Sequence, residues 1–426
     1  MKNILIVGGG GREHALAWKC IQSPHTEKVY VAPGNAGTSL EPGVENVNIS
    51  SDDLEGLLSF AKQNVIDLTI VGPEAPLVAG IVDLFFANGL SIFGPRQFNA
   101  QLEGSKSFAK QFMDQCNIPT AAYEEFTDAK IAIDYLSSQD FPIVVKADGL
   151  AAGKGVVIAQ SYQEAVEAVN SMLTEGVHGA AGQKIVIEEF IQGEEVSFIC
   201  IVDHDVVIPL ASSQDHKARD DGDIGPNTGG MGAYSPAPIV NDALHSKIIE
   251  QVIKPTIQGF IDDHHPYQGF LYAGLMITPS GEPKVLEFNC RFGDPETQPI
   301  LMRLQSDLTK LCWEAAHNQL AACDLLWSPQ TALGVVMAAG GYPFAYEKGA
   351  TISGLDHVTG NTKVFHAGTS LEGKSITTSG GRVLCVTALG DNIQEAQRLA
   401  YEGVEKINWE NAFYRKDIGY RAIKNN

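Results

Sequence analysis

The segment LEFNCRFGDPETQ, residues 286–298, carries polar side chains at every second position of a run that otherwise predicts a strand. Side chains two residues apart on a strand lie on the same face. The polar face is expected to hold Glu287, Asn289 and Arg291, and the opposite, core face Leu286, Phe288 and Cys290. A strand with a carboxylate, an amide and a guanidinium on one side favours a binding site.

This polar face fits the chemistry of Mg²⁺ and phosphate. The oxygens of Glu287 and Asn289 are hard ligands, which Mg²⁺ accepts while it keeps waters and phosphate oxygens as its other ligands. Arg291, just beyond them, can bind a phosphate or a carboxylate through two parallel hydrogen bonds. A solvent-exposed strand face is the alternative, although such a face needs no Asn and this run continues into a loop dense in functional groups.

The loop GLAAGKG, residues 149–155, is a candidate polyphosphate site. Strand-like runs flank it, so we expect a hairpin tip where Gly153 and Gly155 let backbone amides approach phosphate and Lys154 reaches it. Lys146 interrupts an apolar run and needs an anionic partner, because burial of an ammonium group is unfavourable. The alternative for Lys146 is a salt-bridged lysine with a buried stem.

Acidic residues interrupt the next two apolar runs, in KIVIEEFIQGEEVSFICIVD. The carboxylates at 188–189 and 194–195 could accept hydrogen bonds from an adenine amino group and from ribose hydroxyls. A solvated hairpin turn is the alternative interpretation.

Glycines 8–11 follow the first apolar run of the chain. A dinucleotide fingerprint requires a glycine where Glu13 stands and an acid at the end of the second strand, which instead ends APGN. The segment Gly9–Arg12 instead predicts a site for a phosphorylated substrate, since a helix N-terminus favours an anion and Arg12 adds a positive charge. The alternative is a tight turn with a salt-bridged arginine.

Two other glycine-containing segments are candidate functional sites, and only the first is supported. SQDHKARDDGDIGPNTGGMGAYSP, residues 213–236, predicts a long structured loop that includes Asp215, His216, Lys217 and Arg219, and such loops usually carry function. A flexible acidic loop is the alternative. GTSLEGKS, residues 368–375, matches the P-loop pattern, but the run after it predicts a hairpin and not the helix that a P-loop requires.

The elements that position these residues predict an α/β chain of several domains. Repeated strand–helix pairs at 1–103 predict a parallel α/β domain. A two-part α+β region is expected at 104–325, with a smaller mobile unit at about 120–190, and a strand-rich α+β domain at 328–426.

Composition favours a cytoplasmic enzyme of small molecules. Asp and Glu (51) exceed Lys and Arg (30), and the formal charge of −21 disfavours nucleic acid and anionic membranes as partners. Seven scattered cysteines without a CxxC pair fit a reducing compartment. The apolar run in MKNILIVGGG is too short for a signal peptide.

Several motifs together resemble the ATP-grasp ligases: GSKSFAK, VVKADGLAAGKGVVI, VIEEFIQGEEVS, DHK with GPNTGGMGAYSP, and LEFNCRFGDPETQ. With IVGGGGREHALAWK, APGNAGT and VGPEAPLVAGIVD, they resemble the phosphoribosylamine–glycine ligase family over essentially the whole chain. The resemblance implies that ATP phosphorylates the carboxylate of glycine and that the amine of 5-phosphoribosylamine attacks the acyl phosphate, with Mg²⁺ or Mn²⁺ as cofactor.

The resemblance also implies roles for particular residues. Nucleotide binding falls to Lys106, Lys146, Gly153, Lys154, Gly155, Glu188 (beside adenine) and Glu195 (at the ribose), and metal binding to Glu287 and Asn289. The expected substrate-binding residues are Gly9, Gly10, Gly11, Arg12, Asn35, Asp215, Lys217 and Asp294, and the expected catalytic residues are Lys146, Arg291 and Asp215.

The sequence departs from the pattern twice. Relatives often carry Arg directly after DHK, where this chain has Ala218 and then Arg219, and the strand before Glu287 offers no third acidic metal ligand. The alternatives are another ATP-grasp carboxylate–amine ligase and a non-catalytic nucleotide-binding regulator. We expect a monomer or weak dimer.

Overall fold

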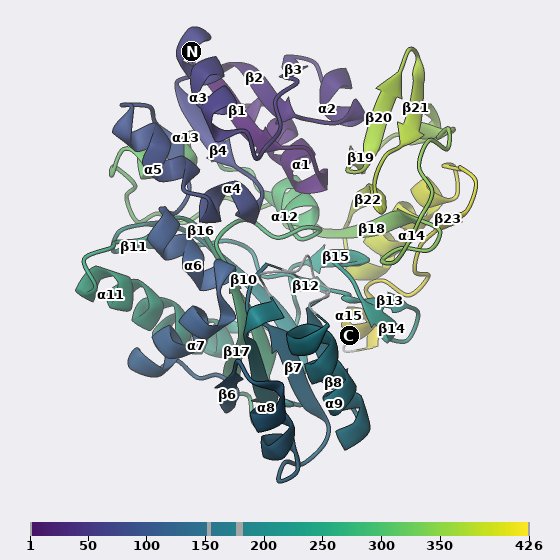
Figure 1. Cartoon of the computed structure of the whole chain (residues 1–426). Coiled ribbons are helices and arrows are strands. Elements are labelled where there is room, and N and C mark those ends of the chain that lie inside the picture. The colour runs from purple at the N-terminus through teal and green to yellow at the C-terminus, as the bar shows by residue number, and fades with distance from the viewer. Residues whose placement is uncertain (1, 151–154, 176–181, 425–426) are drawn as a thin grey trace.

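The N-terminal sheet is built from parallel strands in the order β3-β2-β1-β4-β5 (Figure 1). The computed structural model describes residues 2–150, 155–175 and 182–424. The strands are β1 (Lys2–Gly8), β2 (Thr26–Pro33), β3 (Val44–Asn46), β4 (Leu68–Val71) and β5 (Ile92–Phe93). The helices between them are α1 (Gly11–Cys20), α2 (Ala36–Leu40), α3 (Leu54–Gln63), α4 (Glu74–Val78) and α5 (Ile81–Ala87). Apolar runs such as that of β1 are buried on both faces of the sheet, and the predicted parallel α/β fold is confirmed.

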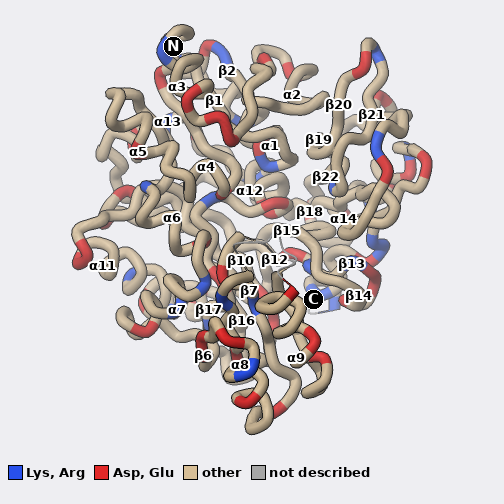
Figure 2. The backbone as a smooth tube through the Cα atoms, viewed as in Figure 1, with Lys and Arg blue, Asp and Glu red and all other residues tan. Residues whose placement is uncertain are grey.

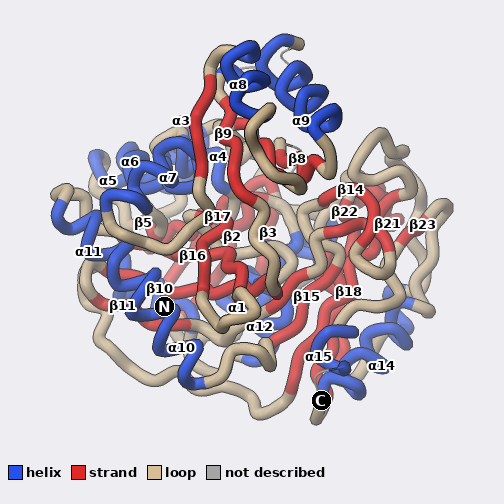
Figure 3. Tube along the Cα trace, turned by 90° about the horizontal axis from the view of Figure 1, so that it is seen from below, coloured by secondary structure: helices blue, strands red, loops and turns tan. Residues whose placement is uncertain are grey.

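A small antiparallel sheet, the lid sheet, follows helices α6 (Gln97–Gly104) and α7 (Lys106–Gln115). Its order is β6-β9-β7-β8, with β6 (Tyr123–Phe126), β7 (Ile143–Ala147), β8 (Val156–Ala159) and β9 (Ile185–Glu189). Helices α8 (Ala129–Leu136) and α9 (Tyr162–Val169) cover its outer face, and α9 continues as a π-helical turn, η1 (Asn170–Thr174) (Figure 3). The inner face of the lid sheet faces the rest of the molecule.

The central sheet is antiparallel in the order β11-β10-β16-β17. Its strands are β10 (Glu194–Asp203), β11 (Val206–Pro209), β16 (Gln268–Ile277) and β17 (Pro283–Asn289). The helical elements of this part of the chain are α10 (Asp242–Ile248), η3 (Ile249–Ile253), α11 (Lys254–Asp262), α12 (Thr297–Arg303) and α13 (Leu308–Ala316). The lid and central sheets confirm the α+β region expected for an ATP-grasp protein.

The C-terminal sheet has the order β12-β15-β18-β22-β19, with β23 beside β18. Its strands are β12 (Gln214–Asp215), β15 (Gly232–Ser235), β18 (Thr331–Ala339), β19 (Thr362–His366), β22 (Arg382–Gly390) and β23 (Ala412–Phe413). Helix α14 (Ile393–Val404) packs on β18 and β22, and η4 (Leu355–His357) and α15 (Tyr420–Lys424) complete this strand-rich region, whose α+β character is confirmed.

Residues 213–236 do not form the loop that the sequence predicts. They contribute β12 and β15 to the C-terminal sheet, and β13 (Ala218–Asp220) pairs with β14 (Ile224–Asn227) between them. All four residues of β15 are buried because the strand pairs with β18, about 100 residues further along the chain. Residues 368–375 do form the predicted hairpin, with β20 (Thr369–Glu372) beside β21 (Ser375–Thr378).

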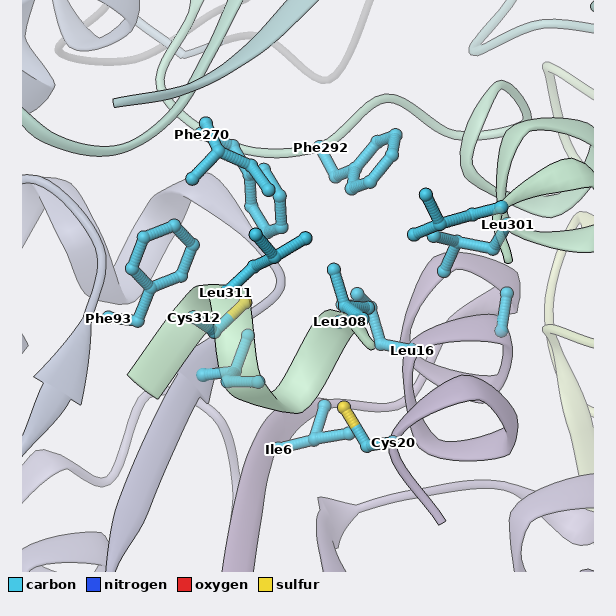
Figure 4. Packing of buried hydrophobic residues seen from close by; sticks show 14 of the residues in the cluster. Ile6, Leu16, Cys20, Phe93, Phe270, Phe292, Leu301, Leu308, Leu311 and Cys312 are labelled. Atoms are coloured by element: carbon cyan, nitrogen blue, oxygen red, sulfur yellow. The ribbon is translucent and has the colours of Figure 1, made fainter. Parts of the chain in front are cut away.

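One large core joins the N-terminal and central sheets (Figure 4). Helix α13 inserts Leu308, Leu311 and Cys312 between α1 and the strands, where they meet Leu16 and Phe270. This packing fixes the N-terminal sheet against the region that carries the polar strand β17. Among the described residues, no helix combines the length and apolar character needed to span a membrane.

Candidate active site

A cavity of about 630 Å³ lies where the lid, central and C-terminal sheets face one another. The predicted site residues that line it are Arg12, Lys106, Lys146, Gly155, Glu188, Glu195, Asp215, Lys217, Glu287, Asn289, Arg291 and Asp294. Gly153 and Lys154 lie outside the described residues. Figure 2 shows acidic segments over much of the outside and basic segments where α7, β7 and β17 meet. The fold thus gathers cationic side chains of an acidic protein at this cavity.

Lysines form the wall of the cavity that suits the phosphates of a nucleotide. Lys146 Nζ on β7 donates to Glu188 Oε2 on β9 at 2.9 Å and to the carbonyl of Leu286 at 3.1 Å. Lys110, from α7, reaches the same oxygen of Glu188 at 3.2 Å. Lys106 lies at the start of α7 and donates to the carbonyl of Gly149 at 3.2 Å, and burial lowers its pKa. Buried ammonium groups of this kind suit a phosphate ligand.

The apolar part of the same wall is formed by Val144, Ile158, Phe190, Ile191, Met276 and Leu286. These side chains come from the lid sheet, from the 190–191 connection and from the central sheet. An apolar slot that ends at polar groups is the usual environment of a bound purine base.

The strand β17 contains a bulge that the sequence alternation did not predict. Gly274 of β16 pairs with Glu287 and Leu275 pairs with Val285, so Leu286 is an extra residue in the ladder. Leu286 therefore lines the cavity beside Glu287 instead of facing the core as expected, and its carbonyl receives the hydrogen bond from Lys146. Phe288 and Cys290 are buried in apolar clusters, as expected.

Glu287 and Asn289 offer oxygen donors on one side of the cavity, which fits a hard divalent cation. The residue opposite Glu287 is Gly274, whose missing side chain leaves room there, since a Cβ would lie 3.1 Å from Glu287 Cγ. Among the described residues there is no cluster of three or more Asp, Glu, His or Cys side chains arranged to hold a metal. A metal here would complete its coordination with phosphate oxygens and water.

Lys217 lies between two carboxylates, that of Glu287, expected to bind the metal, and that of Glu195, expected to bind the ribose. Its Nζ lies 3.3 Å from Glu287 Oε1 and 3.4 Å from Glu195 Oε2. The Lys217 ammonium is the main reason that the pKa of Glu287 is lowered to about 2. Glu287 is therefore ionised and ready to act as a ligand at any physiological pH.

The other end of the cavity holds an arginine between two acids. Arg291 pairs through Nη2 with Glu103 Oε1 at 2.8 Å and through Nε with Glu74 Oε2 at 3.2 Å. Asp215 lines the same cavity with 6 % of its surface exposed, and burial raises its pKa to about 8, helped by Glu296. The cavity thus offers a cation and a protonatable carboxyl, which can bind an amino acid or an amine.

A C-terminal arginine closes this end. Arg382 of β22 pairs with Asp294 Oδ2 at 2.8 Å and donates to the carbonyls of Gly229 and Gly230. Tyr342 OH accepts from Gly229 N at 3.0 Å. The C-terminal sheet therefore contributes directly to the site.

The N-terminal glycines are placed beside the cavity but do not line it. Gly10 N donates to Glu13 Oε2 at 2.5 Å, so one of the free donors expected at this helix start already has a partner. Gly9 packs on the carbonyl of Gly34, and Asn35 donates to the carbonyl of Gly9 at 3.0 Å. Gly11 lies close to the side chains of Asp294 and Gln298. Arg12 reaches the cavity and donates through Nη1 to the carbonyl of Phe292.

The Ala218 departure has a structural counterpart. Arg219 forms two hydrogen bonds with Asp220 and does not line the cavity, so it does not replace an arginine at position 218 there. Instead the buried Arg415 donates to the carbonyl of Ala218 at 3.0 Å and holds the hairpin.

Sequence reasoning missed several polar residues of the site: Glu74, Glu103, Lys110, Tyr272, Glu296, Tyr342 and Arg382. Lys110 lies four residues after Lys106, hence on the same helix face, and that spacing could have revealed it. Tyr272 lies in an unbroken apolar strand, where its hydroxyl donates to Glu296 Oε1 at 2.7 Å, and nothing local marks it.

The fold and cavity define an ATP-grasp protein. The chain superposes on the crystal structure of phosphoribosylamine–glycine ligase from Thermotoga maritima with a TM-score of 0.85 at 32% identity, covering 98% of this chain and 100% of that one. It also resembles the biotin carboxylase domain of Hydrogenobacter thermophilus 2-oxoglutarate carboxylase (TM-score 0.76, 97% and 91% coverage), where 15% identity shows a shared fold alone.

Sequence comparison is more specific. The phosphoribosylglycinamide synthetase N, ATP-grasp (A) and C domain models match residues 2–103, 104–297 and 332–421. Phosphoribosylamine–glycine ligase of Allochromatium vinosum is 62% identical over 421 residues, 99% of this chain and 98% of that protein, and the Escherichia coli O6:H1 enzyme is 57% identical over 423 residues, 99% of each. The chain belongs to the phosphoribosylglycinamide synthetase family.

Proposed function

We propose that the chain ligates glycine to 5-phosphoribosylamine with ATP, giving glycinamide ribonucleotide, ADP and phosphate. A relative that is 62% identical over nearly the full length, the phosphoribosylamine–glycine ligase of Allochromatium vinosum, supports this substrate pair. The structural observation that carries it is a single cavity lined by lysines and apolar side chains as well as by Arg291, Asp215 and Asp294. The lysines and apolar side chains suit a nucleotide, and the other group suits an amino acid and an amine.

In the first step, a glycine carboxylate oxygen attacks the γ-phosphorus of ATP, and the bond to the β,γ-bridging oxygen breaks to release ADP. Lys106 and Lys146 hold the phosphates and offset their charge, while Arg291, fixed by Glu74 and Glu103, orients the attacking carboxylate. A Mg²⁺ or Mn²⁺ ion held by Glu287 and Asn289 would supply further neutralisation of phosphate charge.

In the second step, the amine of 5-phosphoribosylamine attacks the acyl carbon and phosphate leaves. The new C–N bond requires the nitrogen to lose a proton. We propose Asp215 as the acceptor, because burial raises the pKa of its carboxyl to about 8 and makes its carboxylate form a stronger base than an ordinary aspartate. The buried surroundings also limit hydrolysis of the acyl phosphate.

ADP release tests the proposal. It is measured with glycine, alanine or bicarbonate, each with and without freshly made phosphoribosylamine, and Glu287→Gln serves as the inactive control. We expect release that requires glycine and the sugar amine together. Release with bicarbonate alone would overturn the assignment.

Arg12 is the proposed contact of the sugar phosphate. Arg12→Ala should raise the KM for phosphoribosylamine and leave the KM for ATP unchanged, because Arg12 lines the cavity and its charge helps lower the pKa values of Glu74 and Asp294. Arg219→Ala is the matched control, since Arg219 pairs with Asp220 outside the cavity. A change in the KM for ATP would place the residue in the nucleotide site instead.

The formal charge of −21 favours the proposed monomer or weak dimer over tight self-association.

A further inference from the structure

One carboxylate oxygen, Glu188 Oε2, is shared by two ammonium groups. It lies 2.9 Å from Lys146 Nζ and 3.2 Å from Lys110 Nζ. All three residues are buried, with 2 % of Lys110, 2 % of Glu188 and 8 % of Lys146 exposed. With every group ionised, the cluster carries a net charge of +1.

Lys110 lines the cavity, but its ammonium group is anchored by protein groups besides Glu188. Its Nζ donates to Thr120 Oγ1 at 2.8 Å and to the carbonyl of Ala121 at 3.5 Å. Thr120 Oγ1 in turn donates to the carbonyl of Val285 at 2.7 Å, so its lone pairs face the lysine. The Tyr123 ring lies 5.3 Å from Nζ. Among the residues that the structure describes, Glu188 and the Leu286 carbonyl are the hydrogen-bond partners of Lys146 Nζ, and Lys146 lines the cavity.

We propose that Lys110 is a positioning residue that neutralises Glu188, so that Lys146 keeps a full positive charge for the phosphates of the nucleotide. This inference rests on the proposed nucleotide site. Without Lys110, Lys146 and Glu188 form a neutral buried pair, and a polyphosphate that approaches Lys146 also meets the Glu188 carboxylate. In a partly desolvated cleft, one unit of charge changes phosphate affinity strongly.

The charge state of Lys110 is itself finely balanced. Burial lowers its pKa to about 8, and the neighbouring Glu188 carboxylate limits that shift. Lys146, which faces it across Glu188, lowers the pKa further, while Asp114 on its own helix raises it. A bound polyphosphate would stabilise the protonated form.

Calorimetric titration with ADP and with adenosine, both in EDTA, separates charge from structure. Lys110→Met should weaken ADP binding about 10-fold and change adenosine binding less than about twofold, because only ADP carries phosphate. Lys110→Met combined with Glu188→Gln removes one positive and one negative charge, so the ratio of ADP to adenosine affinity should return to the wild-type value. Lys110→Arg should keep that ratio, and the exposed Lys130→Met is the control.

Equal weakening of ADP and adenosine in Lys110→Met, or no recovery in the double variant, would overturn the inference. If Lys110→Met does not fold, Glu188→Gln is compared with the double variant, and the single variant should favour ADP about 10-fold more. Lys146→Met distinguishes the two levels of the argument. Unchanged ADP affinity in that variant would refute the nucleotide site, whereas weaker binding there with normal binding in Lys110→Met would refute only the role of Lys110.

Discussion

Arg415 offers a sharp test of how the C-terminal segment supports the site. It is fully buried, it forms two hydrogen bonds of 2.8 Å with Asp417, and its Nη1 lies 2.9 Å from Asp223 Oδ1 and 3.0 Å from the carbonyl of Ala218. These contacts hold the β13–β14 hairpin, which directly follows Asp215 and Lys217. Replacing the guanidinium by an apolar chain, in Arg415→Met, removes this cation from two carboxylates and a carbonyl, while Asp223 keeps Arg421 and Asp417 keeps the amide of Gly222.

Removing one partner of a buried ion pair costs roughly 3–5 kcal/mol. Asp223 and Asp417 are about a quarter exposed (26% and 24%), so water replaces part of the lost interaction and the lower end, about 3 kcal/mol, applies. At about 1.4 kcal/mol per factor of ten, local opening of the hairpin should become about 100-fold more frequent. The solvent-exposed Arg398, which pairs with Glu402 on α14, should change opening only about twofold when replaced by Met.

Hydrogen exchange followed by mass spectrometry measures this directly. Amides of residues 218–227 should exchange about 100-fold faster in Arg415→Met than in the wild type, with the N-terminal sheet unaffected. The turnover rate should fall as well, because Asp215 and Lys217 lose their fixed placement. Exchange within twofold of the wild type in the hairpin would show that Arg415 does not hold it and would refute the reasoning.

Three further outcomes are expected. Glu287→Gln should weaken Mn²⁺ binding to the ADP complex at least about 10-fold by electron paramagnetic resonance, since a charged ligand is lost; unchanged binding would move the metal elsewhere. Arg382→Met should lower kcat/KM for glycine about 30-fold, equivalent to about 2 kcal/mol for a charged hydrogen bond, and spare the KM for ATP; the reverse pattern would contradict its placement beside Asp294. Burial lowers the pKa of His366 from 6.5 to about 3, so the unfolded chain binds a proton that the native chain does not, and stability falls as pH drops below about 6.5. His366→Gln should flatten that slope by up to about 1.4 kcal/mol per pH unit in urea midpoints between pH 6.5 and 5, and an unaltered slope would exclude His366 as its source.

Local patterns in the sequence predicted some of the charged residues that line the cavity, and the family resemblance supplied others. Glu287, Asn289 and Arg291 could be predicted because polar side chains at alternate positions interrupt an apolar strand. Lys146 could be predicted because it too interrupts an apolar run. The parallel N-terminal sheet follows equally from repeated strand–helix pairs. For the site residues the signal lies within about ten residues of the chain, and for the sheet it lies in a pattern that repeats along residues 1–103.

Long-range partners could not be predicted in this way. Arg382 is separated from Asp294 by 88 residues and belongs to a strand whose sequence is otherwise ordinary. The bulge at Leu286 depends on how β17 pairs with β16, and the pairing of β15 with β18 joins segments about 100 residues apart. The alternation of a single strand contains no information on its partner's register.

Residues 213–236 contribute two strands to the C-terminal sheet, and this limits how the protein can be divided into fragments. A fragment that begins near residue 328 would lack β12 and β15, leaving the edge of β18 bare and prone to aggregate. The complementary fragment would carry those strands with nothing to pair against. Each fragment should fold only when both are produced together. Any natural or engineered exchange of the carboxyl-terminal part must therefore include β12 and β15 from the same protein.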